Sequence, residues 1–190
     1  MGRAQAINDD ELLKQLTATF REVGYEAASL SLLAEAAGLK KASLYHRFPG
    51  GKEEMAQAVL RSASEWLDVH ILQVLEGDGP PEERVTRALD TLRNFYAGGK
   101  QACLLNMLAA GHITRNAFTP MITTMFDQLI LGFAKVARDA GQDEAQSRMA
   151  ARRAVMLLQG SLVMARGTGD PSPFDEALEM IHSSLLGEGA

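Results

Sequence analysis

The sequence predicts an all-α protein in which a domain of three short helices precedes a larger helical domain. Apolar residues recur at three- and four-residue spacing along most of the chain, which is the period of an amphipathic helix. No window alternates between apolar and polar residues as a half-buried strand does. Three short helical segments come first and six mostly longer ones follow, so we divide the chain into residues 1–51 and 52–190.

The first domain has clear helix boundaries. An acidic triplet at residues 9–11 favours a helix start, and Gly24 is expected to end that helix. A second helix is expected over Ser31–Gly38, where the final glycine matches a helix C-cap. A third is expected over Ala42–Phe48, closed by a proline and two glycines at 49–51.

Glycine and proline divide the larger domain into six predicted helices. Pro81, followed by two glutamates, is a typical helix start, and the run GTGDPSP separates the last two helices. The six segments run over about 52–75, 81–95, 101–111, 116–140, 143 or 144 to 166, and 174–186.

The composition is that of a globular chain of 190 residues, 46% hydrophobic, with a formal net charge of −5. Its single cysteine excludes a disulfide framework and a cysteine-rich zinc site within one chain. We expect a cytoplasmic protein, because no apolar run reaches the roughly 18 residues of a membrane span and no secretory signal opens the sequence. No metal or other cofactor is expected, since His70, His112 and His182 lack metal-ligand spacing.

The second and third predicted helices have the physical pattern of a helix-turn-helix. Ala34 and Ala37 are small where two helices must cross closely, and Gly38 permits a left-handed turn between them. Leu44 and Phe48, four residues apart, form the inner side of the third helix. Its outer side is then expected to carry Lys41, Ser43, Tyr45, His46 and Arg47.

The negative charge is unevenly distributed along the chain. Residues 36–52 contain four cations (Lys40, Lys41, Arg47 and Lys52) and no acid, whereas residues 53–190 contain 12 Lys or Arg against 18 Asp or Glu, a net of −6. A charge run is usually an ordinary solvated face. Its coincidence with a helix-turn-helix instead predicts a phosphate-binding face on an otherwise acidic chain.

The segment that joins these features resembles a known family. Residues 24–55 read GYEAASLSLLAEAAGLKKASLYHRFPGGKEEM, which is similar to the signature of the TetR family of one-component transcriptional repressors. The small-residue helix, AAGL, LYHRF and the following Lys-Glu-Glu together make the motif specific. The resemblance is strong over roughly residues 8–60, and the nine-helix layout extends it to the rest.

The resemblance implies that residues 42–48 form a recognition helix in the major groove of DNA. Tyr45 would bind a backbone phosphate, and His46 beside it would contact a base edge or remain solvated. Lys52, with the free N–H groups of the next helix, would hold a phosphate, and Ser29 would cap the second helix and donate to phosphate. The candidates for reading base edges are Lys40, Lys41 and Ser43, because lysine can donate to guanine O6 and N7.

One departure concerns the start of the recognition helix. The family often has Ser or Thr at the N-cap, where this chain has Lys40. We expect a cap weaker by ~1 kcal/mol, offset by a stronger phosphate or base contact.

In the family, the middle helices of the larger domain enclose an effector cavity. Methionine adapts its shape and is common on promiscuous apolar surfaces, although ordinary core packing explains any single one equally well. Trp66 either lines the cavity or closes it. The effector is expected to be a small hydrophobic or amphipathic molecule. The candidate ligand-binding residues are Trp66, Met107, Met121, Met125, Phe126, Met156 and Gln159.

The last two helices are expected to form the homodimer interface as an intermolecular four-helix bundle, as in the family. Small and apolar residues recur there at helical spacing, with Gly160 allowing close approach and Arg148, Arg152 and Arg153 at the rim. The candidate interface residues are Ala154, Leu158, Ser161, Leu162, Leu178 and Ile181.

The function predicted for the chain is ligand-responsive repression of transcription. A homodimer would bind double-stranded, pseudo-palindromic operator DNA and be released by the effector. No enzyme is expected, because the sequence holds neither a phosphate-cradling glycine loop nor a nucleophile–base signature. The alternative is a helical small-molecule-binding protein or enzyme that keeps the helix-turn-helix only as a scaffold. Cys103 lies among apolar residues, which favours an inert buried thiol over a redox sensor.

Overall fold

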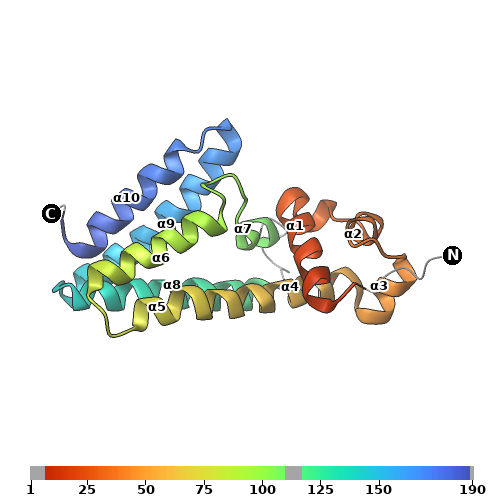
Figure 1. Ribbon diagram of the computed structural model, residues 1–190, viewed down its shortest axis with the longest axis horizontal. Helices are drawn as coiled ribbons and strands as arrows, with labels where there is room; N and C mark the ends of the chain where they lie inside the picture. Colours follow the sequence, from red (N-terminus) through yellow and green to blue (C-terminus); the bar gives the residue numbers. More distant parts are fainter. Residues whose placement is uncertain (1–6, 110–116, 189–190) are drawn as a thin grey trace. The chain divides into compact units, whose positions relative to one another are not determined.

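The computed structural model describes residues 7–109 and 117–188, and every regular element within them is helical, as predicted (Figure 1). These residues form nine helical stretches when three contiguous segments, α4 (Gly51–Leu67), a π-helical segment (Asp68–Leu72) and α5 (Gln73–Glu76), are taken as one. The chain divides into two compact units, one of residues 1–63 with 104–119 and one of residues 64–103 with 120–190.

This division differs from the predicted boundary between residues 51 and 52. The first unit takes in the start of α4 as well as α7 (Leu104–Ala109), which packs against α1 (Asp9–Ala27). Sequence position alone could not place α7 there, because its contacts with α1 join residues about 80 positions apart. The predicted ends of two segments, at Gly111 and Asn116, lie outside the described residues.

The start and the break of α1 both have local causes. The Asn8 side chain accepts a hydrogen bond from the Glu11 N–H at 2.8 Å, and the predicted acidic triplet occupies the first turn. Gly24 interrupts the helix with φ +77°, and the chain then makes one further turn to Ala27. The left-handed conformation of Gly24 favours glycine, and a Cβ there would lie 3.3 Å from the flexible end of Met107 in α7, a tight contact.

The helix-turn-helix forms as predicted from α2 (Leu30–Ala36) and α3 (Lys41–Arg47). Ser29 caps α2 by accepting from the Leu32 N–H at 3.2 Å. Gly38 takes the left-handed conformation with φ +62°, and the Leu39 N–H donates to the Ala34 carbonyl at 2.8 Å, which closes the turn. Leu44 is fully buried, whereas Phe48 is only half-buried.

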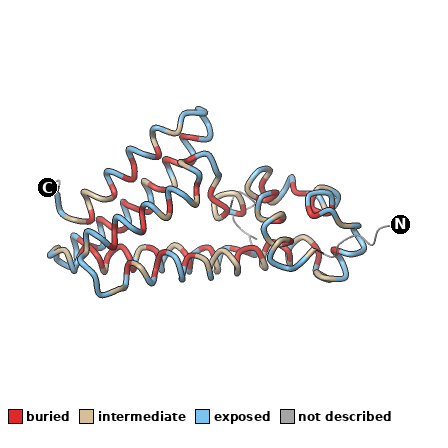
Figure 2. The backbone as a smooth tube through the Cα atoms, viewed as in Figure 1, coloured by how far each residue is buried: buried red, intermediate tan, exposed pale blue. Residues whose placement is uncertain are grey.

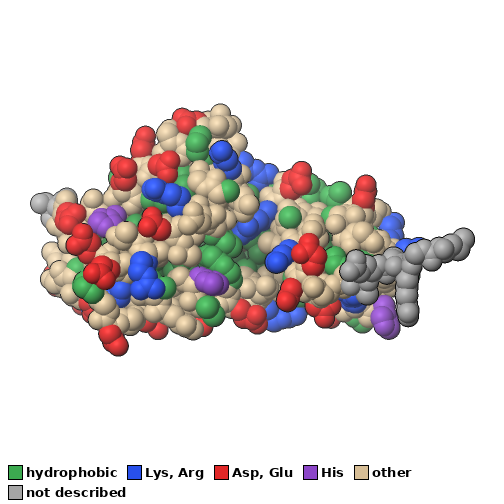
Figure 3. All heavy atoms as spheres, viewed as in Figure 1, with side chains coloured by type: hydrophobic (Ala, Val, Ile, Leu, Met, Phe, Trp, Pro, Cys, Tyr) green, Lys and Arg blue, Asp and Glu red, His purple; other side chains and the backbone are tan. Residues whose placement is uncertain are grey.

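The second unit is built mainly from four long helices whose buried positions recur along one side (Figures 1 and 2). They are α6 (Pro81–Phe95), α8 (Thr119–Asp139), α9 (Glu144–Thr168) and α10 (Ser172–Leu186), and α10 packs along α9 and α6. Asp143 and Gln146 form a reciprocal capping box at the start of α9, which confirms the predicted start of that helix. Acidic and basic side chains are interspersed on the face of this unit drawn in Figure 3.

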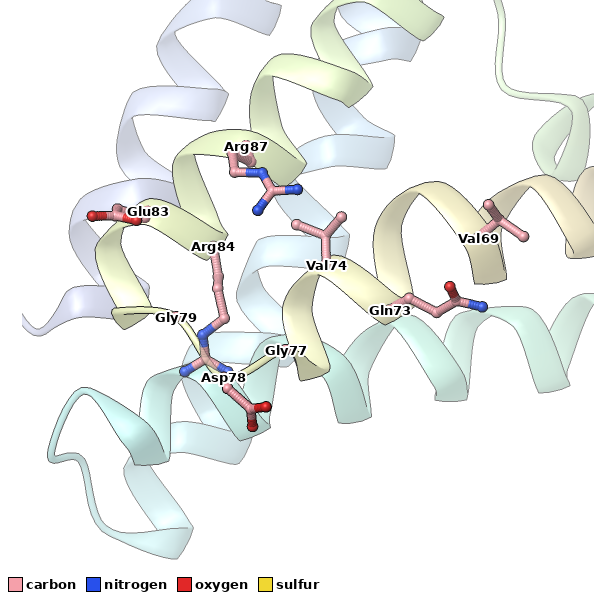
Figure 4. Close-up of a pocket in the computed structure, with 9 residues that line it drawn as sticks. All are labelled: Val69, Gln73, Val74, Gly77, Asp78, Gly79, Glu83, Arg84 and Arg87. Carbon is pink, nitrogen blue, oxygen red and sulfur yellow. The ribbon is translucent and has the colours of Figure 1, made fainter.

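A pocket of about 330 Å³ lies beside the turn between α5 and α6 (Figure 4). Its central cation, Arg84, is only 4% exposed, and its side chain ties three elements together. Nη1 donates to the Leu75 carbonyl at 2.8 Å and Nη2 to Asp139 Oδ2 at 2.7 Å, which Lys135 Nζ also reaches at 2.7 Å. The hydrogen bonds from Lys135 and then Arg84 hold the pKa of Asp139 below its ordinary value.

None of the helices described combines the length and the apolar character needed to cross a bilayer.

Candidate nucleic-acid interface

The outer side of α3 is a continuous exposed surface. Lys41, Ala42, Ser43, Tyr45 and His46 are all exposed, with 46% of Tyr45 accessible, while Leu44 alone of the seven helix residues is buried. This arrangement follows from the helical period, because in a helix of two turns the residues that do not share the side of Leu44 face the solvent. The face therefore offers hydroxyl, imidazole and ammonium groups to a molecule in solution.

Two of the four predicted cations are free on this face. Lys40 and Lys41 are exposed, and neither has a hydrogen-bond or ion-pair partner among the described residues. Lys40 stands at the N-cap of α3 without a side-chain capping bond, as the departure from the family pattern predicted. Both ammonium groups are thus available to phosphate or base edges.

Arg47 lies differently from expectation, because its guanidinium turns toward the start of α1. Nη2 donates to the Ile7 carbonyl at 2.8 Å, and Nη1 lies 3.2 Å from Asp9 Oδ1. Its side chain is 28% exposed. Residues 38 and 40 positions apart meet here, which no local pattern in the sequence signals.

Lys52 lies at the start of α4 and reaches the end of α1. Its Nζ donates to the carbonyls of Tyr25 at 2.9 Å and Glu26 at 3.3 Å, and sits 4.4 Å from the centre of the Tyr25 ring. An ammonium has three N–H donors, so one remains for a phosphate. The pKa of the Tyr25 phenol is raised by its burial and by the negative charges of Glu53 and Glu26.

The candidate ligand-binding residues are divided between the two units. Met107 belongs to the first unit, where it contacts Gly24 in α1. In the second unit Trp66 stacks on Phe95 with ring centres 3.8 Å apart, and Met125 is buried. Met121, Phe126 and Gln159 are half-buried, and Gln159 Oε1 has no hydrogen-bond partner among the described residues.

Met156 does not line an enclosed cavity. It is 64% exposed and borders an open groove between α8 and α9, because its position on α9 points away from the helices that pack against it. The expectation that Met156 contacts an effector stays a prediction.

The six candidate dimer residues are buried inside the single chain. They hold α9 and α10 against their own neighbours, so their side chains have almost no surface left for a partner. The six are Ala154, Leu158, Ser161, Leu162, Leu178 and Ile181.

A different set of residues forms the outer face of α9, which we call the α9 stripe. They recur at intervals of three and four, which places them on one side of the helix. The α9 stripe consists of Ala145, Met149, Arg152, Met156, Gly160, Val163 and Gly167, all exposed. A Cβ at Gly160 or Gly167 would meet nothing within 4 Å among the residues that the structure describes.

Cys103 is buried, and the Tyr96 hydroxyl donates to its Sγ at 3.6 Å. This environment agrees with the interpretation of an inert thiol.

Among the residues that the structure describes, no cluster of His, Cys, Asp or Glu could hold a metal ion; His112 lies outside them.

The fold and the exposed face of α3 define a class, the helix-turn-helix proteins that present a short helix to a DNA groove. A family model described as "Bacterial regulatory proteins, tetR family" matches residues 12–59. Over residues 12–59 the chain is therefore similar to the TetR family of bacterial regulatory proteins.

Curated relatives agree with this assignment. The repressor KstR2 of Mycolicibacterium smegmatis is 36% identical over 77 residues, which are 40% of this chain and 37% of the relative. The regulator RutR of Escherichia coli K12 is 28% identical over 150 residues, covering 74% and 68% of the two chains. The match therefore spans only about a third of the length of the first of these relatives.

Solved structures share the fold over nearly the whole chain. A TetR transcriptional regulator from Legionella pneumophila has a TM-score of 0.83 at 22% identity and covers 96% of this chain and 99% of its own. The regulator CifR, solved as a cysteine mutant complexed with a 26-bp double-strand operator DNA, has a TM-score of 0.75 at 24% identity, with 97% and 98% covered.

Proposed function

We propose that the protein is a homodimeric repressor that binds a pseudo-palindromic operator through α3 and is released by a small hydrophobic or amphipathic effector. The observation that carries the proposal is the exposed face of α3, with accessible Tyr45 and two lysines that have no partner among residues 7–109 and 117–188. Two copies of this face, about 34–36 Å apart, would meet successive major grooves.

The contacts divide into phosphate binding and base reading. Tyr45, Lys52 and Ser29 bind phosphate: the Tyr45 hydroxyl is accessible, the Lys52 ammonium has one N–H left, and Ser29 can donate its hydroxyl proton while it caps α2. Lys40, Lys41, Ser43 and His46 face the base edges. The remainder of the chain is acidic and repels DNA away from this face.

Operator binding is tested with a duplex from the gene's own upstream region, or with one recovered by in vitro selection. Affinity is measured by fluorescence anisotropy at several salt concentrations for the wild type, Tyr45→Ala and Lys41→Ala. Removing a cation that neutralises a phosphate reduces the magnitude of the slope of log K against log salt by about 0.9, whereas removing the neutral Tyr45 weakens binding without changing that slope. Lys14→Gln, which removes an exposed charge on α1, is the matched control. Unchanged affinity and slope in both variants would overturn the proposed interface.

The dimer forms through the α9 stripe together with the exposed side of α10, where Met180 is accessible. Exposed methionines flank two glycines, so a second helix can approach closely over an apolar surface. An open groove of about 1110 Å³ between α8 and α9 adjoins the α9 stripe and is rimmed by Arg148, Arg152 and Arg153.

The effector binds in the second unit near Trp66. Trp66 is the chain's single tryptophan, and its stacking on Phe95 makes its fluorescence sensitive to a ligand that separates or covers the rings. Candidate apolar compounds are therefore titrated against intrinsic fluorescence and against operator release. A compound that releases DNA without altering the emission would place the effector elsewhere.

A further inference from the structure

The recognition helix α3 has few anchors of its own. It is seven residues long, lacks a side-chain cap at Lys40 and buries only Leu44. A helix this short is not stable in isolation, so its orientation depends on the contacts it makes with the rest of the first unit. Leu44 alone would act as a pivot, because one buried side chain fixes a point but not a direction.

Arg47, the last residue of α3, supplies a second anchor. Its two terminal nitrogens hold the Ile7 carbonyl at 2.8 Å and the Asp9 carboxylate at 3.2 Å. These acceptors lie on either side of Asn8, the N-cap of α1. A planar guanidinium bound through two nitrogens is fixed in direction as well as in position.

We infer that Arg47 is a positioning residue that orients α3 for the operator and does not contact DNA. The inference rests on the proposed function, since it concerns the same DNA-binding face. Lys41, Tyr45 and His46 point outward on α3, whereas the guanidinium of Arg47 is engaged with the start of α1. The cation therefore contributes to affinity through the geometry of α3 and not through charge neutralisation of phosphate.

Salt dependence separates these two roles. A cation that neutralises a phosphate contributes about 0.9 to the slope of log K against log salt, whereas a positioning residue contributes nothing to it. Arg47→Lys keeps the charge, but a single ammonium cannot reproduce the two-nitrogen fork. We expect this variant to bind the operator about tenfold more weakly, the loss that follows when one charge-assisted hydrogen bond is removed, with an unchanged slope.

Asp9→Ala provides a second test, because the positioning role and simple charge repulsion predict opposite changes in affinity. Removing an acid beside a DNA-binding face strengthens binding if only long-range charge matters. Because Asp9 holds Arg47, we expect binding about twofold weaker instead, with the Ile7 carbonyl still in place. Lys14→Gln serves again as the matched charge control, and circular dichroism melting verifies that every variant is folded.

The outcomes are distinct from those of the proposed function. A wild-type protein that binds no duplex from the upstream region or from selection refutes the proposed function itself. A wild type that binds, together with an Arg47→Lys variant of equal affinity or a tighter Asp9→Ala variant, refutes the positioning role. A reduced salt slope in Arg47→Gln also refutes it, since that result identifies a direct phosphate contact.

Discussion

Lys52 Nζ lies 2.9 Å from the Tyr25 carbonyl oxygen and 4.4 Å from the centre of the Tyr25 ring. The start of α4 is thereby fastened to the last turn of α1, just after the break at Gly24. The Tyr25 ring also meets Phe118 edge-on at 4.9 Å and Phe20 at 6.2 Å. One aromatic residue thus joins α1, α4 and the chain preceding α8 within the first unit.

Replacing Tyr25 with leucine should destabilise the first unit. The change removes the two ring contacts and the cation–π contact, which together contribute about 1–3 kcal/mol. Urea denaturation followed by circular dichroism measures the loss. Tyr25→Phe keeps the ring and should unfold within about 0.5 kcal/mol of the wild type. A leucine variant as stable as the phenylalanine variant would show that the ring contacts are unimportant.

The raised pKa of Tyr25 predicts a loss of stability at alkaline pH. Burial first, and then Glu53 and Glu26, favour the neutral phenol in the folded chain. Its contribution is therefore complete below the unfolded pKa of about 10 and is lost as the pH rises from there through the higher folded value. Near-ultraviolet titration of the wild type should include a late tyrosine step that Tyr25→Phe lacks. Persistence of that step in the variant would assign it to another residue.

Local signals in the sequence were enough for the helices and for the outer face of α3. Gly24, Gly38 and the Ser29 cap act on neighbouring residues, so their effects are visible within a few positions. The contacts of Arg47 with Ile7 and of Lys52 with Tyr25 join residues 27 or more positions apart, and a single sequence has no signal for them.

The α9 stripe shows a second limit of prediction from the sequence. Periodicity correctly placed a helix over residues 144–166, yet both sides of that helix are rich in small and apolar residues. Choosing which side faces the protomer requires the packing of α10 and α6, which periodicity does not contain. The side assigned to a partner, including Leu158 and Leu162, is the side that packs inside.

The two sides of α9 should respond differently to mutation. Met156 is 64% exposed, so Met156→Glu leaves the protomer folded but places a charge in the proposed interface. Leu158 is buried in the protomer, so Leu158→Ala should cost about 2–5 kcal/mol of protomer stability. Sedimentation equilibrium and thermal melting measure the two effects separately. A dimeric Met156→Glu protein would exclude the α9 stripe as the interface.

Arg84 should be one of the most sensitive polar residues in the second unit. Arg84→Met leaves the buried Leu75 carbonyl without its donor and removes one of two cations from Asp139, so we expect a loss of about 2–4 kcal/mol. Lys135→Met breaks only the exposed bond to the same carboxylate, within a single turn of α8, and should cost about 0.5 kcal/mol or less. Guanidinium denaturation of both variants compares the buried and the exposed hydrogen bond to the Asp139 carboxylate. If the two variants lose the same free energy of unfolding, the Leu75 carbonyl gains another donor when Arg84 is removed. The contact between α5, α6 and α8 would then depend on packing alone.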